Sequence, residues 1–237
     1  MSEQLFCSIA YNVHDSSVSF AINDCAVLVL EAERVFKIKK KGVNNKKEME
    51  YLIQYGLSYL KKGVDDVTHW SMTTLQNPLL QKEDVFNLDT GLPKDPYWKE
   101  VIILGKKRNV LIVNHHLAHA ATYLMSDFKD AVIVTCDGGG DYNESYEEGE
   151  CVGVYIGKNN SIKRVDIDLA GMMNGRAYGS CSCFLYDDVH CEGKMMAIAA
   201  YGTPMREVID KLESVYSELG TDFYQDSAEI LGKLFQI

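Results

Sequence analysis

The chain has 237 residues, of which 46% are hydrophobic and 24% are charged, as expected for a globular protein with a sizeable core. Its formal net charge of −10 argues against non-specific binding to nucleic acid, so we expect no nucleic-acid partner. No run of about eighteen apolar residues occurs, residues 1–4 carry no secretory signal, and the cysteine number of seven is odd, so we expect no membrane span and a cytoplasmic, reduced protein.

The first predicted elements form an antiparallel meander of three strands, at 5–11, 18–22 and 25–32. A polar loop containing His14 joins the first two strands, and Asn23-Asp24 is a tight-turn pair. Taken alone, the loop is typical of a solvated turn.

The elements that follow are less regular. In order they are a basic run at 33–41, an amphipathic helix at 46–62 ended by Gly63, a strand at 67–72, a polar loop at 77–96 and a short helix at 97–105.

The most informative stretch begins with a buried strand at 110–113. Asn114 then stands at a helix N-cap position, ahead of a helical run at 116–125. Positions i and i+4 share one face of a helix, so His115 and His119 can direct both imidazoles at one divalent metal. A surface or packed histidine pair is the alternative.

A second apolar strand at 131–136 ends in Asp137-Gly138-Gly139-Gly140-Asp141. A carboxylate at a strand end can bind a metal, and bare glycine amides let a phosphate approach. In open α/β sheets ligands bind beyond the carboxyl ends of strands, so we expect both motifs to share one site.

The order of elements at 5–32 then recurs as strand 131–136, acidic loop 137–149, strand 151–156, turn 158–160 and strand 162–169. Two such meanders resemble the duplicated ribonuclease-H-like lobes of the actin, sugar-kinase and heat-shock ATPase superfamily, an α/β fold with mixed sheets. The resemblance implies a first lobe at 1–128 and a partial, incomplete second lobe at 129–237.

The last part of the chain offers two further candidate sites. Gly193-Lys194 opens a predicted helix at 192–202, where amides and the helix dipole favour an anion, although a packed core helix fits as well. Arg176, in a glycine-rich segment at 171–179, is a candidate anion contact. Cys181, Cys183, His190 and Cys191 have a spacing that favours free thiols over zinc, and another amphipathic helix is predicted at 204–219.

Five motifs in this order resemble the carbamoyltransferase family that includes nodulation-factor and aminoglycoside-tailoring enzymes, with hydrogenase-maturation carbamoyltransferases and tRNA threonylcarbamoyladenosine synthases as distant relatives. They are Val13-His14-Asp15-Ser16-Ser17, Glu33-Arg34-x-x-x-x-Lys39, Asn114-His115-His116-Leu117-Ala118-His119-Ala120-Ala121, Asp137-Gly138-Gly139-Gly140-Asp141 and Glu192-Gly193-Lys194-Met195-Met196-Ala197-Ile198-Ala199-Ala200-Tyr201-Gly202.

The resemblance implies ATP-dependent transfer of a carbamoyl group from carbamoyl phosphate, through a carbamoyl-adenylate, to a hydroxyl of a small molecule. It implies a divalent metal, iron before zinc or magnesium, on His115, His119 and Asp137. His14 would act as acid or base, and Lys39 would neutralise phosphate or carbamoyl oxygens. Gly138, Gly139, Gly140, Gly193 and Lys194 would line the nucleotide.

The sequence also departs from the family pattern. Val35-Phe36-Lys37 replaces the usual Phe-Thr-Arg, and Met196-Ala197 replaces Met-Gly. The adenylate-forming module and a late metal carboxylate are not found, so we expect the chain to be an N-terminal portion that does not complete the reaction alone and that self-associates through its second lobe. A small-molecule kinase of the same superfamily and a non-catalytic nucleotide- or metal-binding module are the alternatives.

Overall fold

The computed structural model describes residues 3–12, 14–43, 45–74, 95–140, 150–166, 174–188, 191–203, 205–207 and 210. The chain divides into two compact units. The first unit consists of Met1–Phe128 with Gly140–Glu150, and the second of Lys129–Gly139 with Cys151–Ile237.

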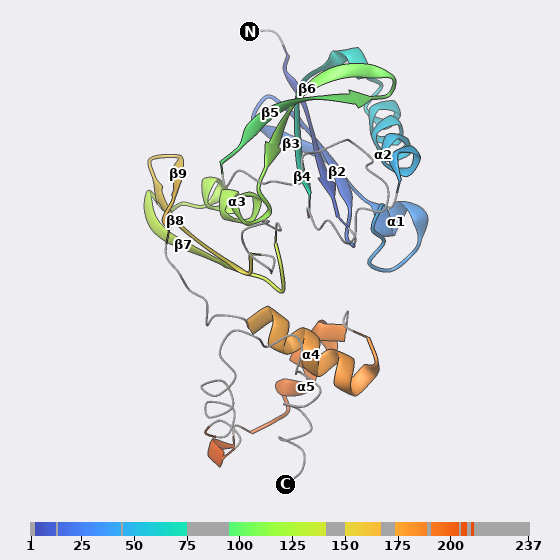
Figure 1. Cartoon of the computed structure of the whole chain (residues 1–237). Coiled ribbons are helices and arrows are strands. Elements are labelled where there is room, and N and C mark those ends of the chain that lie inside the picture. The colour runs from blue at the N-terminus through green and yellow to red at the C-terminus, as the bar shows by residue number, and fades with distance from the viewer. Residues whose placement is uncertain are drawn as a thin grey trace. The chain divides into compact units, whose positions relative to one another are not determined.

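A six-stranded mixed sheet forms the body of the first unit, with the strand order β3-β2-β1-β4-β6-β5 (Figure 1). The strands are β1 (Leu5–Tyr11), β2 (Ser17–Ile22), β3 (Cys25–Glu31), β4 (Val67–Thr74), β5 (Tyr97–Ile103) and β6 (Lys106–Val113). β1, β2 and β3 pair antiparallel, which confirms the predicted meander. β4 is parallel to β1 and β6 is parallel to β4, so the sheet has the ribonuclease-H-like arrangement that the resemblance implied.

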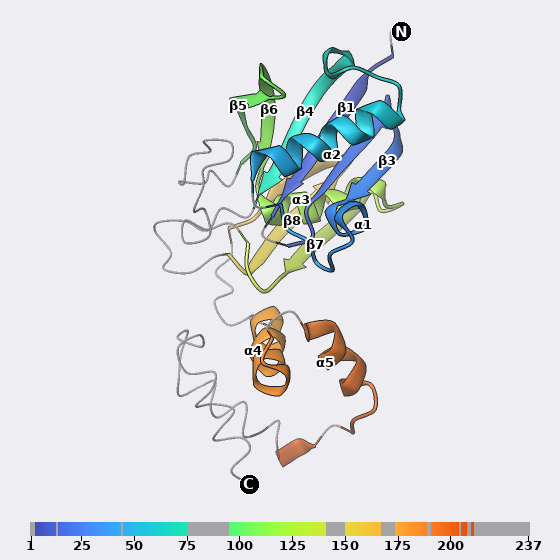
Figure 2. The same cartoon turned by 90° about the vertical axis from the view of Figure 1, so that its right-hand side faces the viewer.

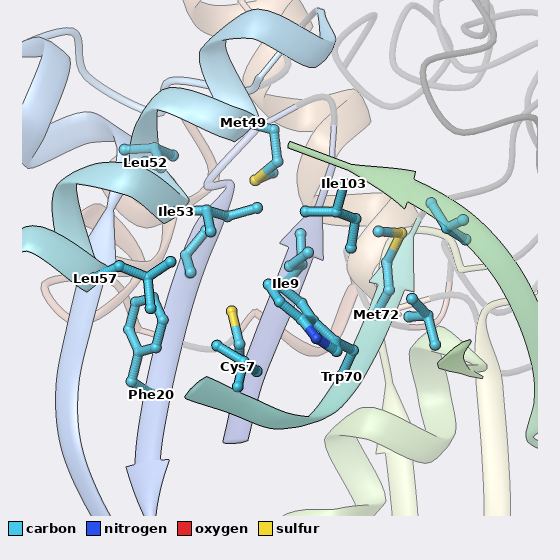
Figure 3. Close-up of a cluster of buried hydrophobic side chains, with 14 of the residues drawn as sticks. Cys7, Ile9, Phe20, Met49, Leu52, Ile53, Leu57, Trp70, Met72 and Ile103 are labelled. Carbon is cyan, nitrogen blue, oxygen red and sulfur yellow. The ribbon is translucent and has the colours of Figure 1, made fainter. Parts of the chain in front are cut away.

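The core of this unit lies between the sheet and helix α2 (Lys46–Tyr59), which crosses one face of the sheet (Figure 2). Alternate residues of β1 point to that face, because side chains of a strand alternate between its two sides. They meet the apolar stripe of α2, as Figure 3 shows. The largest buried side chains here include Leu5, Ile9, Phe20, Met49, Leu52, Ile53, Met72, Ile103 and Ile112.

Helix α2 ends differently from the prediction. Lys61 takes the left-handed conformation with φ of 55°, and Gly63 does not, with φ of −93°. The Lys62 amide donates to the Leu57 carbonyl over 2.9 Å and the Lys61 amide to Ser58 over 3.1 Å, which is a Schellman motif. The helix therefore ends two residues before the predicted position at Gly63, because Lys61 takes the left-handed conformation that glycine usually provides. Part of the basic run also forms a short helix, α1 (Ala32–Phe36), that was not predicted.

The helix predicted at 97–105 is wrong, because this segment is strand β5, paired antiparallel with β6. The two strands are joined through Leu104 and Gly105, with φ of 50° and 74°. Two successive positive φ angles characterise the tight turns that match strand twist. The Leu104 amide donates to Glu50 Oε1 over 2.8 Å, which holds this turn against α2.

The predicted helix at 116–125 is confirmed in two parts, α3 (His115–Ala120) and the 3₁₀ turn η2 (Ala121–Met125). A second 3₁₀ turn, η1 (Val64–Asp66), precedes β4.

The second unit begins with a three-stranded antiparallel sheet of β7 (Asp130–Cys136), β8 (Val152–Lys158) and β9 (Ser161–Arg164). Its β8–β9 turn at Asn159 and Asn160 is confirmed, with φ of 46° and 60°. β9 ends at Arg164, because Val165 and Asp166 are outside the strand, and the last three residues of the predicted 162–169 lie outside the described residues. Two helices follow, α4 (Asn174–Tyr186) and α5 (Glu192–Ala199), the latter as predicted.

One face of β7 and β8 exposes apolar side chains. Val132 is 69% exposed, Val134 51% and Ile156 42%, and Val132 lies directly opposite Ile156 in the strand register.

Several predicted segments fall outside the described residues: 77–94 of the polar loop, 141–149 of the acidic loop, His190, the side chain of Arg176, and nearly all of 204–219. Among the helices that are described, none has the length and apolar character needed to cross a bilayer.

Candidate functional site

The histidine helix α3 starts where strand β6 ends, as the sequence predicted. Asn114 is its N-cap, and the Asn114 Oδ1 atom accepts a hydrogen bond from the Leu117 amide over 3.1 Å. This cap satisfies one of the amides that every helix leaves unpaired at its start. Because β6 is parallel to β4 and β4 to β1, α3 begins at the carboxyl end of the sheet's parallel strands.

His115 and His119 converge as their spacing predicted. Their Nε2 atoms are 3.1 Å apart, and the ring centroids are 4.6 Å apart at an interplanar angle of 82°. Two nitrogens bound to one ion at about 2.1 Å would lie about 3.0 Å apart at a right angle and about 3.4 Å apart at a tetrahedral angle. The observed separation falls between these values. His115 is 8% exposed, whereas His119 is exposed, so a bound ion would retain access to solvent.

Asp137 follows strand β7 and has a carboxylate held by its own neighbour. The Gly138 amide donates to Asp137 Oδ1 over 2.6 Å, and the Asp137 amide donates to the Cys151 carbonyl over 2.9 Å. One ligand atom from each of His115, His119 and Asp137 lies within 4.8 Å of the others.

These three residues fit a divalent metal by their chemistry. Two imidazoles and one carboxylate are the donor set of many zinc sites and of the facial triad of non-haem iron. In the part of the chain that the structure describes, no other group of three such side chains is close enough to share an ion.

Two of the three predicted glycines, Gly139 and Gly140, differ in the space around them. Gly139 faces open space, since a Cβ atom added there would meet nothing within 4 Å. A Cβ on Gly140 would lie 2.6 Å from His116 Cδ2 and 2.8 Å from the Glu150 carbonyl oxygen. Packing against His116 is thus a sufficient reason for glycine at position 140.

His116 is the functional-site residue that sequence reasoning missed. It is fully buried, and its Nε2–H donates to the Glu150 carbonyl oxygen over 2.8 Å. The sequence placed it only as the start of a helix. Nothing in its spacing indicates a partner thirty-four positions away.

The two predicted catalytic residues, His14 and Lys39, lie on loops that are joined by hydrogen bonds. The Asp15 amide donates to the Lys40 carbonyl over 3.4 Å, and the Ser16 amide donates to the Lys41 carbonyl over 3.1 Å. Lys39 itself is exposed. The structure thus brings the segments of His14 and Lys39 side by side.

The buried hydroxyl of Ser16 fastens these loops. Its Oγ accepts from the Asn12 amide over 3.1 Å and from the Val43 amide over 3.0 Å, and donates to the Asn12 carbonyl over 2.8 Å. His14 Nδ1 lies 2.8 Å from Asp15 Oδ2, so the carboxylate accepts its proton and orients the ring. Asn12 Oδ1 is buried, and none of the described residues donates to it.

Gly193 and Lys194 lie in the first turn of α5, in the second unit. A Cβ on Gly193 would meet nothing within 4 Å, and Lys194 Nζ sits 5.2 Å from the centroid of the Tyr186 ring. Cys181, Cys183 and Cys191 form no disulfide, and His190 lies outside the described residues. Burial raises the pKa of the Cys181 thiol.

Comparisons with known proteins bear on this arrangement. Glucokinase from Balamuthia mandrillaris in complex with glucose is similar in structure, with a TM-score of 0.33 and 7% identity over 78% of this chain and 57% of that one, a level that carries no argument. The nodulation protein NolNO of Sinorhizobium fredii (strain NBRC 101917 / NGR234) is 22% identical over 224 residues, covering 90% of this chain and 32% of the relative. The chain thus spans about a third of that relative's length. The family described as the carbamoyltransferase N-terminus matches residues 5–231, and the chain therefore belongs to this family.

Proposed function

We propose that this chain forms the metal-binding, acceptor-activating part of an ATP-dependent O-carbamoyltransferase. The overall reaction would move a carbamoyl group from carbamoyl phosphate, through a carbamoyl-adenylate, to a hydroxyl of a small molecule. Family membership supports carbamoyl transfer as the chemistry. The observation that carries the proposal is the convergence of His115, His119 and Asp137.

His115, His119 and Asp137 would hold the metal, with iron placed before zinc on the family resemblance alone, because both ions accept two histidines and one carboxylate. When bound, the ion would supply a Lewis acid for phosphate oxygens. The chain's own contribution would be to hold the ligands in place: Asn114 starts the helix at the right residue, and the Gly138 amide orients the Asp137 carboxylate.

His14 would act as the base for the acceptor hydroxyl. Its Nδ1–H donates to Asp15, and Nε2 would be the nitrogen that takes the proton. The hydroxyl proton would move to Nε2 as the oxygen attacks the carbamoyl carbon and the adenylate leaves as AMP. Lys39, on the adjoining loop, would offset negative charge on that leaving group.

The remaining predicted site residues would contact the nucleotide. Gly138, Gly139, Gly140, Gly193 and Lys194 stay proposed nucleotide contacts. Among them Gly139 and Gly193 have the open surroundings that a phosphate needs.

We expect the isolated chain to bind the ion without completing the reaction, because it matches about a third of its relative. We also expect it to self-associate through the exposed face of β7 and β8, where Val132, Val134 and Ile156 remain uncovered. Sedimentation of the Val132→Lys/Val134→Lys variant beside the unaltered chain tests this, and equal masses for both would contradict it.

Elemental analysis of the purified chain tests the proposed metal site. We expect about one iron or zinc per chain, and its loss in the His115→Ala/His119→Ala variant. His69→Gln is the matched control, because His69 stacks on Phe6 in β1 and belongs to no candidate metal group. Folded chain that takes up no metal from iron- or zinc-supplemented buffer would refute the site. Carbamoylated product formed by the chain alone would refute the expectation of inactivity.

A further inference from the structure

His116 has a chemical environment that its two neighbouring histidines lack. It is fully buried, its Nε2–H donates to the Glu150 carbonyl, and its ring fills the space where Gly140 would carry a side chain. Gly140 and Glu150 are the residues immediately before and after the acidic segment 141–149. One imidazole therefore contacts both ends of that segment from the first turn of α3.

We propose that His116 is a positioning residue for the metal site, which locks the base of the acidic loop against α3 and so holds Asp137 near His115 and His119. The inference rests on the proposed metal-binding function and adds to it a residue that does not contact the ion. Below, this set of His116, Gly140 and Glu150 is called the histidine latch.

Chain connectivity transmits the effect of the latch to Asp137. Asp137 is three residues before Gly140, so its Cα atom lies within about 11 Å of the latched glycine. On the other side of the loop, Glu150 is followed at once by Cys151, whose carbonyl accepts the Asp137 amide over 2.9 Å. Both chain segments that support Asp137 thus begin at the latch.

The hydrogen-bonding capacity of the ring explains why a histidine serves here. A carbonyl oxygen only accepts, so Nε2 of His116 carries a proton and satisfies the Glu150 carbonyl. An apolar residue of similar size would remove this bond from a partly buried carbonyl, and the loss of such a bond costs stability. Asn114 Nδ2 adds a longer contact of 3.5 Å to Glu150 Oε2.

Direct ligation by His116 is disfavoured by the same geometry. Its Nε2 is occupied by the Glu150 carbonyl, and its ring centroid is 6.4 Å from that of His119, compared with 4.6 Å between His115 and His119. His116 is also not part of the group whose ligand atoms converge.

Cobalt binding to the full chain tests the latch. Co²⁺ affinity and the visible d–d spectrum would be measured for the unaltered chain, His116→Leu, His116→Gln and Asp137→Asn. Residues that orient metal ligands typically change metal affinity by about 10- to 100-fold, and we expect His116→Leu to lose affinity in this range. We expect His116→Gln, whose amide N–H reaches a similar position, to recover most of it.

The double variant His116→Leu/Asp137→Asn separates positioning from general destabilisation. If His116 acts through Asp137, the Co²⁺ affinity of the double variant should be close to that of whichever single variant binds Co²⁺ more weakly. His69→Gln is again the control and should bind as the unaltered chain does. Affinity of His116→Leu within threefold of the unaltered chain, or losses that add fully in the double variant, would overturn the proposal.

Hydrogen exchange in the metal-free chain gives a readout independent of the ion. We expect His116→Leu or, if that variant does not fold, Gly140→Ala to speed exchange of the Asp137 amide while β1 and β4 amides keep their protection. His116→Gln should leave exchange at Asp137 close to that of the unaltered chain. If the unaltered chain binds no Co²⁺ but the variants show this local change, the metal function is refuted and the latch is retained. Unchanged exchange at Asp137 in every variant would refute the latch.

Discussion

Replacing Ser16 with alanine should loosen the loop that carries His14 more than its small size suggests. The change removes one hydroxyl but affects three backbone groups: the Asn12 amide, the Val43 amide and the Asn12 carbonyl. A buried polar group left without its partner costs about 1–3 kcal/mol. The bond to Val43 is buried, while the two to Asn12 are partly reached by water. We therefore expect a loss of about 2–4 kcal/mol in the free energy of unfolding.

Urea unfolding followed by tryptophan fluorescence measures this loss, because Trp70 is 4% exposed and lies in the core of the first unit. With a slope of about 2–3 kcal/mol per molar urea, the midpoint should fall by about 1 M. Ser8→Ala is the matched control. The Ser8 hydroxyl accepts from Ser71 over 2.9 Å at an exposed position, so its loss should change the free energy by less than about 0.5 kcal/mol.

Equal midpoints for Ser16→Ala and Ser8→Ala would refute the reasoning, because the buried hydroxyl would then contribute no more than an exposed one. A large loss of stability with no faster exchange of the Val43 amide would refute the assigned cause. In that case the loss would arise elsewhere than in the joint between the two loops.

Three further predictions concern the scaffold. Gly56→Ala should lower the free energy of unfolding by about 1–3 kcal/mol despite alanine's higher helix propensity, because the new Cβ would collide with the Phe20 ring. Urea unfolding checks this, and a stabilised variant would contradict it. Burial raises the pKa of the Cys7 thiol, so above about pH 8.5 this thiol ionises in the unfolded chain but not in the folded one, and the free energy of unfolding should fall as the pH rises. Cys7→Val should reduce this pH dependence in unfolding midpoints measured from pH 7 to 10. Asn45→Ala removes the α2 cap, whose Oδ1 accepts the Glu48 amide over 3.0 Å, and should cost about 1 kcal/mol, whereas no shift in melting would contradict it.

The parts of the site that follow local rules could be predicted from the sequence. The cap at Asn114 and the spacing of His115 and His119 depend only on helix geometry, and both are confirmed in α3. The meander of β1 to β3 is likewise encoded in apolar runs separated by turn residues.

The features that sequence reasoning missed depend on contacts distant in the chain or on unusual turn residues. The β5–β6 turn has Leu104 where asparagine or aspartate is typical. The sequence therefore lacks the usual signal for a hairpin, and the prediction of a helix at 97–105 is wrong. Lys61 ends α2 in a conformation usually left to glycine. The contact of His116 with Gly140 links two elements, and no periodicity reports such a contact.

The parallel pairing of β1 with β4 also has a consequence for the order of folding. The Thr68 hydroxyl donates to the Leu5 carbonyl across 63 residues of chain, whereas the β1–β2–β3 meander needs only short turns. Closing long loops is entropically slow, so the meander should form first, then β4, and only afterwards β6 with the histidine pair that follows it. An ion that binds this pair would therefore bind only chains whose sheet is already assembled, and would shift the folding equilibrium toward that folded state. Metal supply would then govern how long the completed unit survives, with little influence on how fast it assembles.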